Sequence, residues 1–224
     1  MLTAIGDVMR QCYERGWITT RDGNISLRRS LEGTVANHLH ITPSGFRKTT
    51  IYPENVMKLR FQEPEGDLIW ESGKPSGELH MHWLLQRRVP STRAVVHVHA
   101  THVVAAMYAG FKLQDLAKEF PEVFRYTRVG PNVASLPATS VELGEATAQA
   151  LGVCSRTGKV EYDIVGQDRH GVCAVGKHPW DAYEHVERLN HVCEIVLAGS
   201  IHRLSTGPSS KKDANNFSDI DLWP

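Results

Sequence analysis

Residues 94–100 read Ala-Val-Val-His-Val-His-Ala, a run in which two histidines alternate with β-branched apolar residues. Such a run is typical of a buried strand, whose side chains alternate between its two faces. His97 and His99 are two residues apart, so both imidazoles leave the same face. Two imidazoles on one face can bind one metal ion, although two half-buried histidines with hydrogen-bonding neighbours would give the same pattern.

A third histidine, His170, follows some seventy residues later in Asp-Arg-His-Gly-Val, at a predicted turn into a strand. Catalytic zinc sites typically use three protein ligands and leave one position for water or substrate. Histidine ligands bind as neutral imidazoles, each oriented by a hydrogen-bond acceptor behind it. The sequence therefore offers a third candidate ligand.

Glu78 stands at the start of a predicted helix, in Lys-Pro-Ser-Gly-Glu-Leu-His-Met-His over residues 74–82. The helix dipole alone favours an acidic residue there, so the position is not specific by itself. Glu78 and His82 are four residues apart and share a helix face. Glu78 is the candidate for a carboxylate with a chemical role beside the metal.

Three turns of small polar residues precede the histidine strand, at 23–26, 42–45 and 76–77. Consecutive backbone N–H groups in turns form concave sites for anions. Any one of these turns alone would be unremarkable, but three in order before a histidine pair form a pattern. The candidate residues are Asn24, Ser44, Gly45, Ser76 and Gly77.

Composition indicates an ordinary globular protein: 224 residues, 41% hydrophobic, formal net charge zero. A neutral balance argues against a nucleic-acid or membrane surface, and no apolar run approaches the roughly 20 residues that cross a bilayer. The four cysteines lack the close spacing of a zinc knuckle or redox pair. Without a recognisable signal peptide, a cytoplasmic protein is expected.

The periodicity predicts one domain of mixed α/β or α+β class over residues 1–204, followed by a polar tail over 205–224. Short apolar runs bounded by turns predict the strands, and apolar residues at helical spacing predict the helices. The predicted helices cover 2–16, 78–88, 101–109, 142–151 and 179–197, and the predicted strands lie near 24–27, 39–42, 67–71, 94–98, 160–165 and 172–175.

Together these motifs resemble those of the class II aldolase/adducin family, and within it the zinc-dependent L-fuculose-phosphate aldolase branch. The resemblance covers roughly residues 2–200, and the order and spacing of five motifs make it specific. Those motifs are Gly-Asn-Ile-Ser at 23–26, Ile-Thr-Pro-Ser-Gly at 41–45, Lys-Pro-Ser-Gly-Glu at 74–78, Ala-Val-Val-His-Val-His-Ala at 94–100 and His-Gly at 170–171.

The resemblance implies a three-layer α/β/α sandwich around a mainly antiparallel sheet, assembled as a homotetramer. It further implies that His97, His99 and His170 bind zinc, and that Glu78 is the acid/base carboxylate, able to bind the metal until substrate displaces it. Three histidines favour zinc, with manganese and cobalt left open. The resemblance places the phosphate or distal end of the substrate at Asn24, Ser44, Gly45, Ser76 and Gly77.

The implied activity is reversible retro-aldol cleavage of a sugar phosphate or related hydroxy-ketone through a metal-stabilised enediolate. Two departures concern the substrate: Gly77 stands where the family often has a second serine, and residues 133–139 lack the tyrosine of fuculose-type aldolases. Pentulose-phosphate 4-epimerase, dehydratase and decarboxylase remain alternatives, although the epimerases tend to carry aspartate in place of Glu78. A non-catalytic adducin-like scaffold is the alternative of another class, and the complete histidine set argues against it.

Overall fold

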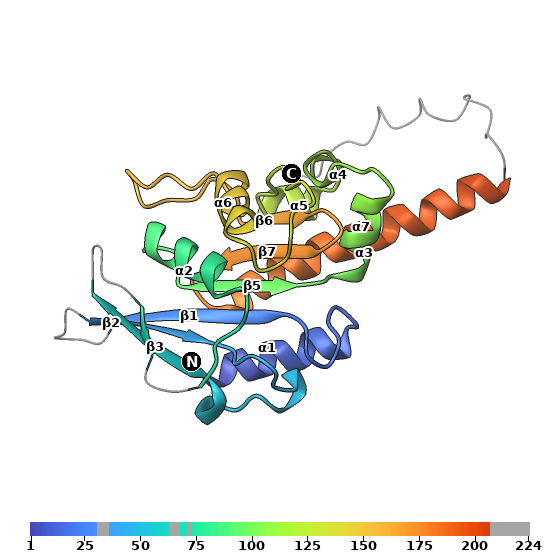
Figure 1. The fold of residues 1–224 in the computed structure, drawn as a ribbon. Helices are drawn as coiled ribbons and strands as arrows, with labels where there is room; N and C mark the ends of the chain where they lie inside the picture. Colours follow the sequence, from blue (N-terminus) through green and yellow to red (C-terminus); the bar gives the residue numbers. More distant parts are fainter. Residues whose placement is uncertain (31–35, 63–67, 71–72, 207–224) are drawn as a thin grey trace, which may run out of the picture.

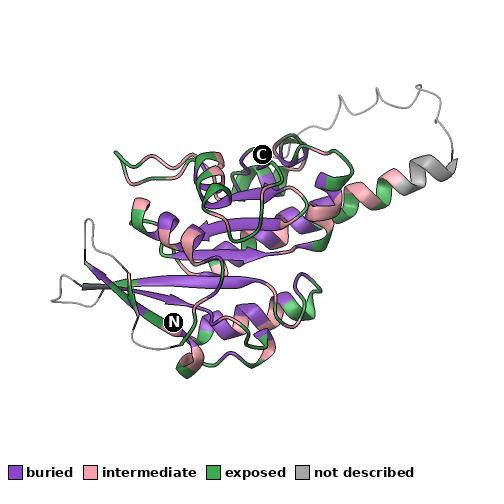
Figure 2. Ribbon diagram, in the orientation of Figure 1, coloured by how far each residue is buried: buried purple, intermediate pink, exposed green. Residues whose placement is uncertain are grey.

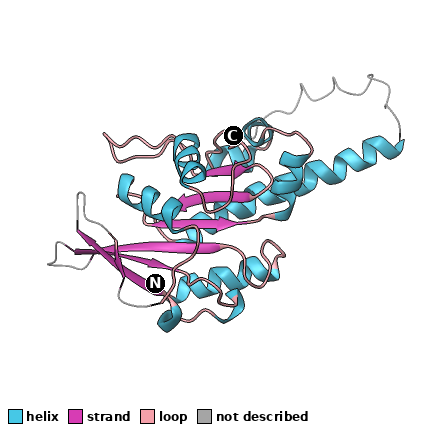
Figure 3. Ribbon diagram, in the orientation of Figure 1, coloured by secondary structure: helices cyan, strands magenta, loops and turns pink. Residues whose placement is uncertain are grey.

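The histidine strand lies inside a single antiparallel sheet. The structure, a computed structural model, describes residues 1–30, 36–62, 68–70 and 73–206. Within these ranges seven strands pair in the order β4-β3-β2-β1-β5-β7-β6, and each neighbouring pair is antiparallel (Figures 1 and 3). They are β1 (Asn24–Ser30), β2 (Ala36–Ile41), β3 (Met57–Gln62), β4 (Ile69–Trp70), β5 (Ala94–Val98), β6 (Ile164–Gln167) and β7 (Gly171–Gly176).

Strand β5 is buried along its whole length (Figure 2). Its side chains divide between two apolar layers. Val96 and Val98 belong to the larger hydrophobic cluster on one face of the sheet. Val95 belongs to a separate cluster on the other face, and His97 shares that face by the strand's two-residue repeat. The face that carries His97 is therefore the one opposite the main core.

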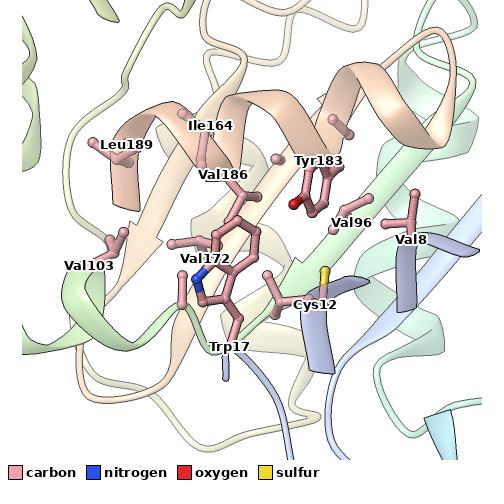
Figure 4. Packing of buried hydrophobic residues seen from close by; sticks show 14 of the residues in the cluster. Val8, Cys12, Trp17, Val96, Val103, Ile164, Val172, Tyr183, Val186 and Leu189 are labelled. Carbon is pink, nitrogen blue, oxygen red and sulfur yellow. The ribbon is translucent and has the colours of Figure 1, made fainter. Parts of the chain in front are cut away.

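Helices cover both faces, which confirms the three-layer α/β/α sandwich. The main core includes Trp17 and Tyr183, whose ring centroids lie 5.3 Å apart (Figure 4). Helices of this layer are α1 (Thr3–Glu14), α3 (Thr101–Tyr108), α4 (Leu113–Glu119), α5 (Pro121–Tyr126) and α7 (Pro179–Thr206). The opposite layer consists of α2 (Leu79–Arg88) and α6 (Val141–Ala150), which pack on each other. None of the described helices combines the length and hydropathy needed to span a bilayer.

The sequence analysis missed several short elements. Strand β3 was not predicted, although its buried Leu59 and Phe61 alternate with charged neighbours. The short helices α4 and α5, which meet at Pro121, and the 3-10 turns η1 (Lys48–Thr50) and η2 (Pro53–Asn55) were also missed. Strand β6 begins at Ile164, later than predicted, because the backbone N–H groups of Glu161 and Tyr162 donate to Leu151 rather than to a strand.

Two predicted segments fall partly outside the described residues. Helix α7 continues past residue 197 to Thr206, and it extends beyond the sheet in Figure 1. The proposed tail therefore overlaps the end of this helix at 205–206, and residues 207–224 lie outside the described residues. Of the strand predicted over 67–71, the structure describes β4 alone, because residues 67 and 71 also lie outside.

Candidate metal centre and substrate cleft

Three histidines from two parts of the chain converge at one end of the sheet. His97 is on β5, His99 follows the end of that strand, and His170 lies in the turn between β6 and β7. One ring nitrogen from each lies within 4.8 Å of the others. The ring centroids are 4.7 to 5.3 Å apart. The three predicted metal ligands are thus brought together.

A backbone carbonyl fixes the tautomer of His97. Its Nδ1 lies 3.0 Å from the carbonyl oxygen of Val172, and the ring is 1% exposed. A carbonyl oxygen only accepts hydrogen bonds, so Nδ1 carries the proton and donates it. Nε2 of His97 is left with a free lone pair, as a metal ligand requires.

Burial keeps the three imidazoles in the neutral form. It is the main cause of the lowered pKa of His97, which falls well below 6.5, and the neighbouring His99 and His170 lower it further. Burial also lowers the pKa of His99, opposed by Asp22. The pKa of His170 is lowered by burial and by His99, and raised by Glu78. Neutral imidazole is the form that binds a metal ion.

Backbone geometry at the turn between β6 and β7 allows His170 to approach the other two rings. Arg169 adopts a positive φ of 56° just before the histidine. At Gly171 a Cβ would lie 2.5 Å from the carbonyl oxygen of Val98 and 2.9 Å from Cδ2 of His99. Only glycine lets β7 pass this close to the histidine strand.

Glu78 directs its carboxylate at the triad from the start of α2. Its Oε1 lies 3.9 Å from Nε2 of His170 and accepts a hydrogen bond of 3.1 Å from the backbone N–H of Thr139. The residue is 7% exposed. Burial raises the pKa of Glu78, while His170 and the Thr139 N–H act in the opposite direction. A carboxyl group in this setting can exchange a proton closer to neutral pH than an exposed one.

Backbone pairing joins two of the predicted anion-binding turns. Pro43 and Pro75 form an antiparallel bridge, the N–H of Ser44 donates to the carbonyl of Lys74, and that of Ser76 donates to the carbonyl of Thr42. The joined turns and the triad border one cleft of about 190 Å³. All nine predicted site residues line it: Asn24, Ser44, Gly45, Ser76, Gly77, Glu78, His97, His99 and His170.

The same cleft contains residues that the sequence analysis did not single out. Lys48 is 2% exposed, and its Nζ donates to the carbonyl of Pro43 at 3.3 Å. Thr139 has a positive φ of 64°, which is rare for a β-branched residue. Asp22 also lines the cleft, and its negative charge acts to raise the pKa of both Lys48 and His99. No periodicity or motif marked these residues, because they reach the cleft through tertiary structure.

The donor set fits a divalent metal ion. Three neutral imidazoles with a carboxylate nearby match the ligand chemistry of a catalytic site that keeps a position for substrate. Tyr126, the nearest tyrosine in sequence to residues 133–139, is 51% exposed on α5 and is not among the residues lining the cleft.

Comparisons with known proteins find relatives of three activities. An L-fuculose phosphate aldolase of Methanococcus vannielii is 27% identical, covering 80% of this chain and 90% of its own. A methylthioribulose-1-phosphate dehydratase of Methylococcus capsulatus is 29% identical, covering 81% and 85%. A 3-oxo-tetronate 4-phosphate decarboxylase of Pectobacterium atrosepticum is 30% identical, covering 83% and 78%.

The fold comparison agrees with these relatives. The crystal structure of a sugar-phosphate aldolase from Thermotoga maritima superposes with a TM-score of 0.74, at 25% identity, over 93% of this chain and 96% of its own. The family model described as the class II aldolase and adducin N-terminal domain matches residues 3–197, a range that contains every site residue above. On the strength of that match, this chain belongs to the class II aldolase and adducin N-terminal domain family.

Proposed function

We propose that the chain is a zinc-dependent aldolase that reversibly cleaves a sugar phosphate or a related hydroxy-ketone. The observation that carries the proposal is the position of the Glu78 carboxylate, 3.9 Å from a ring nitrogen of the histidine triad. A binding scaffold needs neither a triad of neutral imidazoles nor a buried carboxyl group with a raised pKa.

Glu78 moves the proton in this scheme. When bound, the metal ion supplies Lewis acidity toward the carbonyl and adjacent hydroxyl oxygens of the substrate. In cleavage, the carbinol hydroxyl gives its proton to water, from which Glu78 is reprotonated after each turnover. The neighbouring carbon–carbon bond breaks, and the electron pair stays on the carbon beside the carbonyl. Protonated Glu78 delivers a proton to that carbon, and in condensation its carboxylate removes the same proton.

The joined turns hold the distal, anionic end of the substrate. The backbone N–H groups of Gly45 and Gly77 and the side chains of Asn24, Ser44 and Ser76 belong to residues that line this part of the cleft. Gly77 lacks the hydroxyl group of a second serine. The buried ammonium of Lys48 supplies a positive charge in the same region, which favours a phosphate or carboxylate group.

Dehydration of a sugar phosphate is the second candidate function. It is favoured by the absence of tyrosine from the described residues that line the cleft, because cleavage then lacks a tyrosine to take the proton of the carbinol hydroxyl and to return it in condensation. The dehydratase relative is about as similar to this chain as the aldolase relative. Decarboxylation and epimerisation would use the same histidine triad and the same Glu78 carboxylate, so the triad and carboxylate do not distinguish these reactions.

A substrate screen with product identification tests the proposal. The zinc-loaded protein is incubated with phosphorylated and unphosphorylated ketoses and hydroxy-acids, and the products are identified by NMR. Cleavage into two carbonyl compounds is the expected result. Loss of water, release of carbon dioxide, or conversion to an epimer as the sole reaction would replace the aldolase assignment with the corresponding activity. Zinc-free protein serves as the control.

We also propose a homotetramer. Tyr108 on α3 and Phe124 on α5, which are 78% and 70% exposed, are aromatic side chains that such an assembly would cover. Light scattering coupled to size-exclusion chromatography should give about four times the chain mass of 25.0 kDa. A monomer mass would contradict this assembly.

A further inference from the structure

A continuous chain of buried polar side chains runs from α2 to the cleft. Nε2 of Gln86 donates to the carbonyl of Arg93 at 3.0 Å and to Oγ of Ser26 at 3.1 Å. The ring of His82 lies between Ser26 and Asn24, with Nδ1 2.7 Å from Oγ of Ser26 and Nε2 2.5 Å from Oδ1 of Asn24. Ser26, His82 and Gln86 are fully buried.

The directions of the hydrogen bonds in this chain follow from its two ends, the Arg93 carbonyl oxygen and the Asn24 amide oxygen, which can only accept. The carbonyl of Arg93 only accepts, so the Gln86 atom facing it is the amide nitrogen, which also donates to Ser26. Because Oδ1 of Asn24 also only accepts, Nε2 of His82 is the donor there, and Nδ1 accepts the proton of the Ser26 hydroxyl. In a neutral ring the proton must reside on Nε2, which donates to Oδ1 of Asn24.

The hydrogen bond between His82 and Asn24 determines which atoms of the Asn24 amide face the cleft. With Oδ1 engaged by His82, the Nδ2 amino group makes no hydrogen bond within the described part of the chain. Asn24 itself lines the cleft beside Ser44 and Ser76. The side chain therefore offers N–H donors to a ligand in the cleft. With the amide reversed, an oxygen lone pair would face any anionic group there.

We infer that His82 is a positioning residue, which locks the Asn24 amide so that its N–H groups point at an anionic oxygen of the substrate. The inference rests on the proposed function for the identity of that anion, a phosphate or a carboxylate. It assigns His82 no contact with substrate and no proton transfer. Its role is to keep the Asn24 amide oriented as a hydrogen-bond donor. Substrate binding then loses no conformational entropy in ordering this side chain.

Binding of inorganic phosphate, followed by calorimetry, tests the inference without requiring turnover. Titrations use zinc-loaded protein and chelator-treated protein, which separates phosphate held by the turns from phosphate bound to the metal. His82→Leu removes the donor and should weaken phosphate binding by about tenfold or more, the loss expected for a hydrogen bond to a charged group. His82→Gln retains an amide N–H near the Nε2 position and should recover most of that loss.

Two controls separate positioning from a structural effect. His191→Leu makes the same chemical change at an exposed site on α7 and should leave phosphate affinity and zinc content unchanged. In an Asn24→Ala background, His82→Leu should cause no further loss, because the group that it positions is gone. Additive losses, an equal defect in His82→Gln and His82→Leu, or a wild-type protein that binds neither phosphate nor acetate would each overturn the inference.

Nitrogen NMR of histidine-labelled wild-type protein gives a readout that is independent of ligand and of variant folding. We expect the ring of His82 to be protonated at Nε2 and unprotonated at Nδ1, and the opposite tautomer would overturn the inference. Parallel titrations with acetate distinguish a carboxylate from a phosphate site. Failure of carbon–carbon cleavage in the substrate screen would contradict the proposed function while leaving these binding and tautomer results to decide the role of His82.

Discussion

Oε1 of Glu78 lies 3.9 Å from Nε2 of His170, and both side chains are largely buried. The carboxylate is thus next to the triad while its backbone begins helix α2. The contact connects the loop that carries Ser76 and Gly77 with the turn that carries His170. The acid/base role that we propose for Glu78 depends on the carboxyl group and not on the shape of the side chain.

Glu78→Gln keeps the shape and removes the proton-transfer group. We expect this variant to retain its zinc and to lose turnover by about 10²- to 10⁴-fold, the usual contribution of a positioned acid/base. Steady-state kinetics and metal analysis of the same preparation measure both quantities. Glu142→Gln, at an exposed glutamate on α6, is the matched control. Full activity of Glu78→Gln would remove Glu78 from the mechanism.

The same substitution should stabilise the metal-free protein at neutral pH. Burial raises the pKa of Glu78 above its ordinary value of 4.5, so the unfolded chain loses this proton at a lower pH than the folded chain. As the pH rises through 4.5, ionisation therefore favours unfolding, and the penalty persists at neutral pH. Thermal unfolding should show a higher Tm for Glu78→Gln than for wild type near pH 7, with the difference shrinking near pH 4. A constant difference would contradict this account.

Much of the site could be predicted from sequence because its residues lie in local patterns. The bounds of β5 were predicted correctly from its valines, and the two-residue repeat placed His97 and His99 on one face. Of the five proposed substrate residues, Asn24 begins β1 and the other four lie in loops or turns, whose small residues and glycines are visible in the sequence. The Pro43–Pro75 bridge joins two of these turns, which are far apart in the sequence. Periodicity does not predict this pairing, whereas the resemblance to the family implied that both turns lie at the same end of the substrate.

Other site residues had no local signal. Thr139 contributes a backbone N–H, which any residue except proline possesses, and its positive φ depends on packing around it. Lys48 is a lysine in a polar stretch, and only tertiary structure buries it. His82 was placed on the face of Glu78, but its contact with β1 requires the pairing of helix and sheet. These contacts join segments that are far apart in the sequence, and hydrophobic periodicity predicts only local elements and not how they pair.

Loss of a ligand imidazole should lower the metal content. His97→Ala removes the ring whose Nδ1 is held by the carbonyl of Val172 and whose Nε2 is free to bind the metal. We expect zinc to fall well below one ion per chain after dialysis, as measured by elemental analysis. His191→Ala, at the exposed site on α7, controls for nonspecific binding by histidine. An unchanged zinc stoichiometry in His97→Ala would refute the ligand assignment.

Gly171→Ala should damage the metal site without altering a ligand. The added Cβ would lie 2.5 Å from the carbonyl oxygen of Val98 and 2.9 Å from the His99 ring, so β7 or the ring must move. We expect weaker zinc binding and a loss of stability of about 1 to 3 kcal/mol, the range for overpacked sites. Gly199→Ala on α7, where a Cβ meets nothing within 4 Å, is the control and should not weaken zinc binding. Wild-type zinc affinity in Gly171→Ala would contradict the close packing described here.

Gly77→Ser, which adds a hydroxyl group, should tighten phosphate binding only when the methyl group of Thr139 has been removed. A Cβ at Gly77 would lie 3.1 Å from Cγ2 of Thr139, so Gly77→Ser alone places its hydroxyl against a crowded methyl group. Thr139→Gly removes that methyl, accommodates the positive φ of 64° without strain, and keeps the N–H that donates to Glu78.

Calorimetric titration with inorganic phosphate should therefore rank the variants. Gly77→Ser with Thr139→Gly should bind about tenfold more tightly than Thr139→Gly alone, because the new hydroxyl adds one hydrogen bond to a charged group. Gly77→Ser in the presence of Thr139 should give little of this gain. Equal gains in the two backgrounds would mean that the Thr139 methyl does not limit the site, and no gain in either would mean that position 77 does not face the anion.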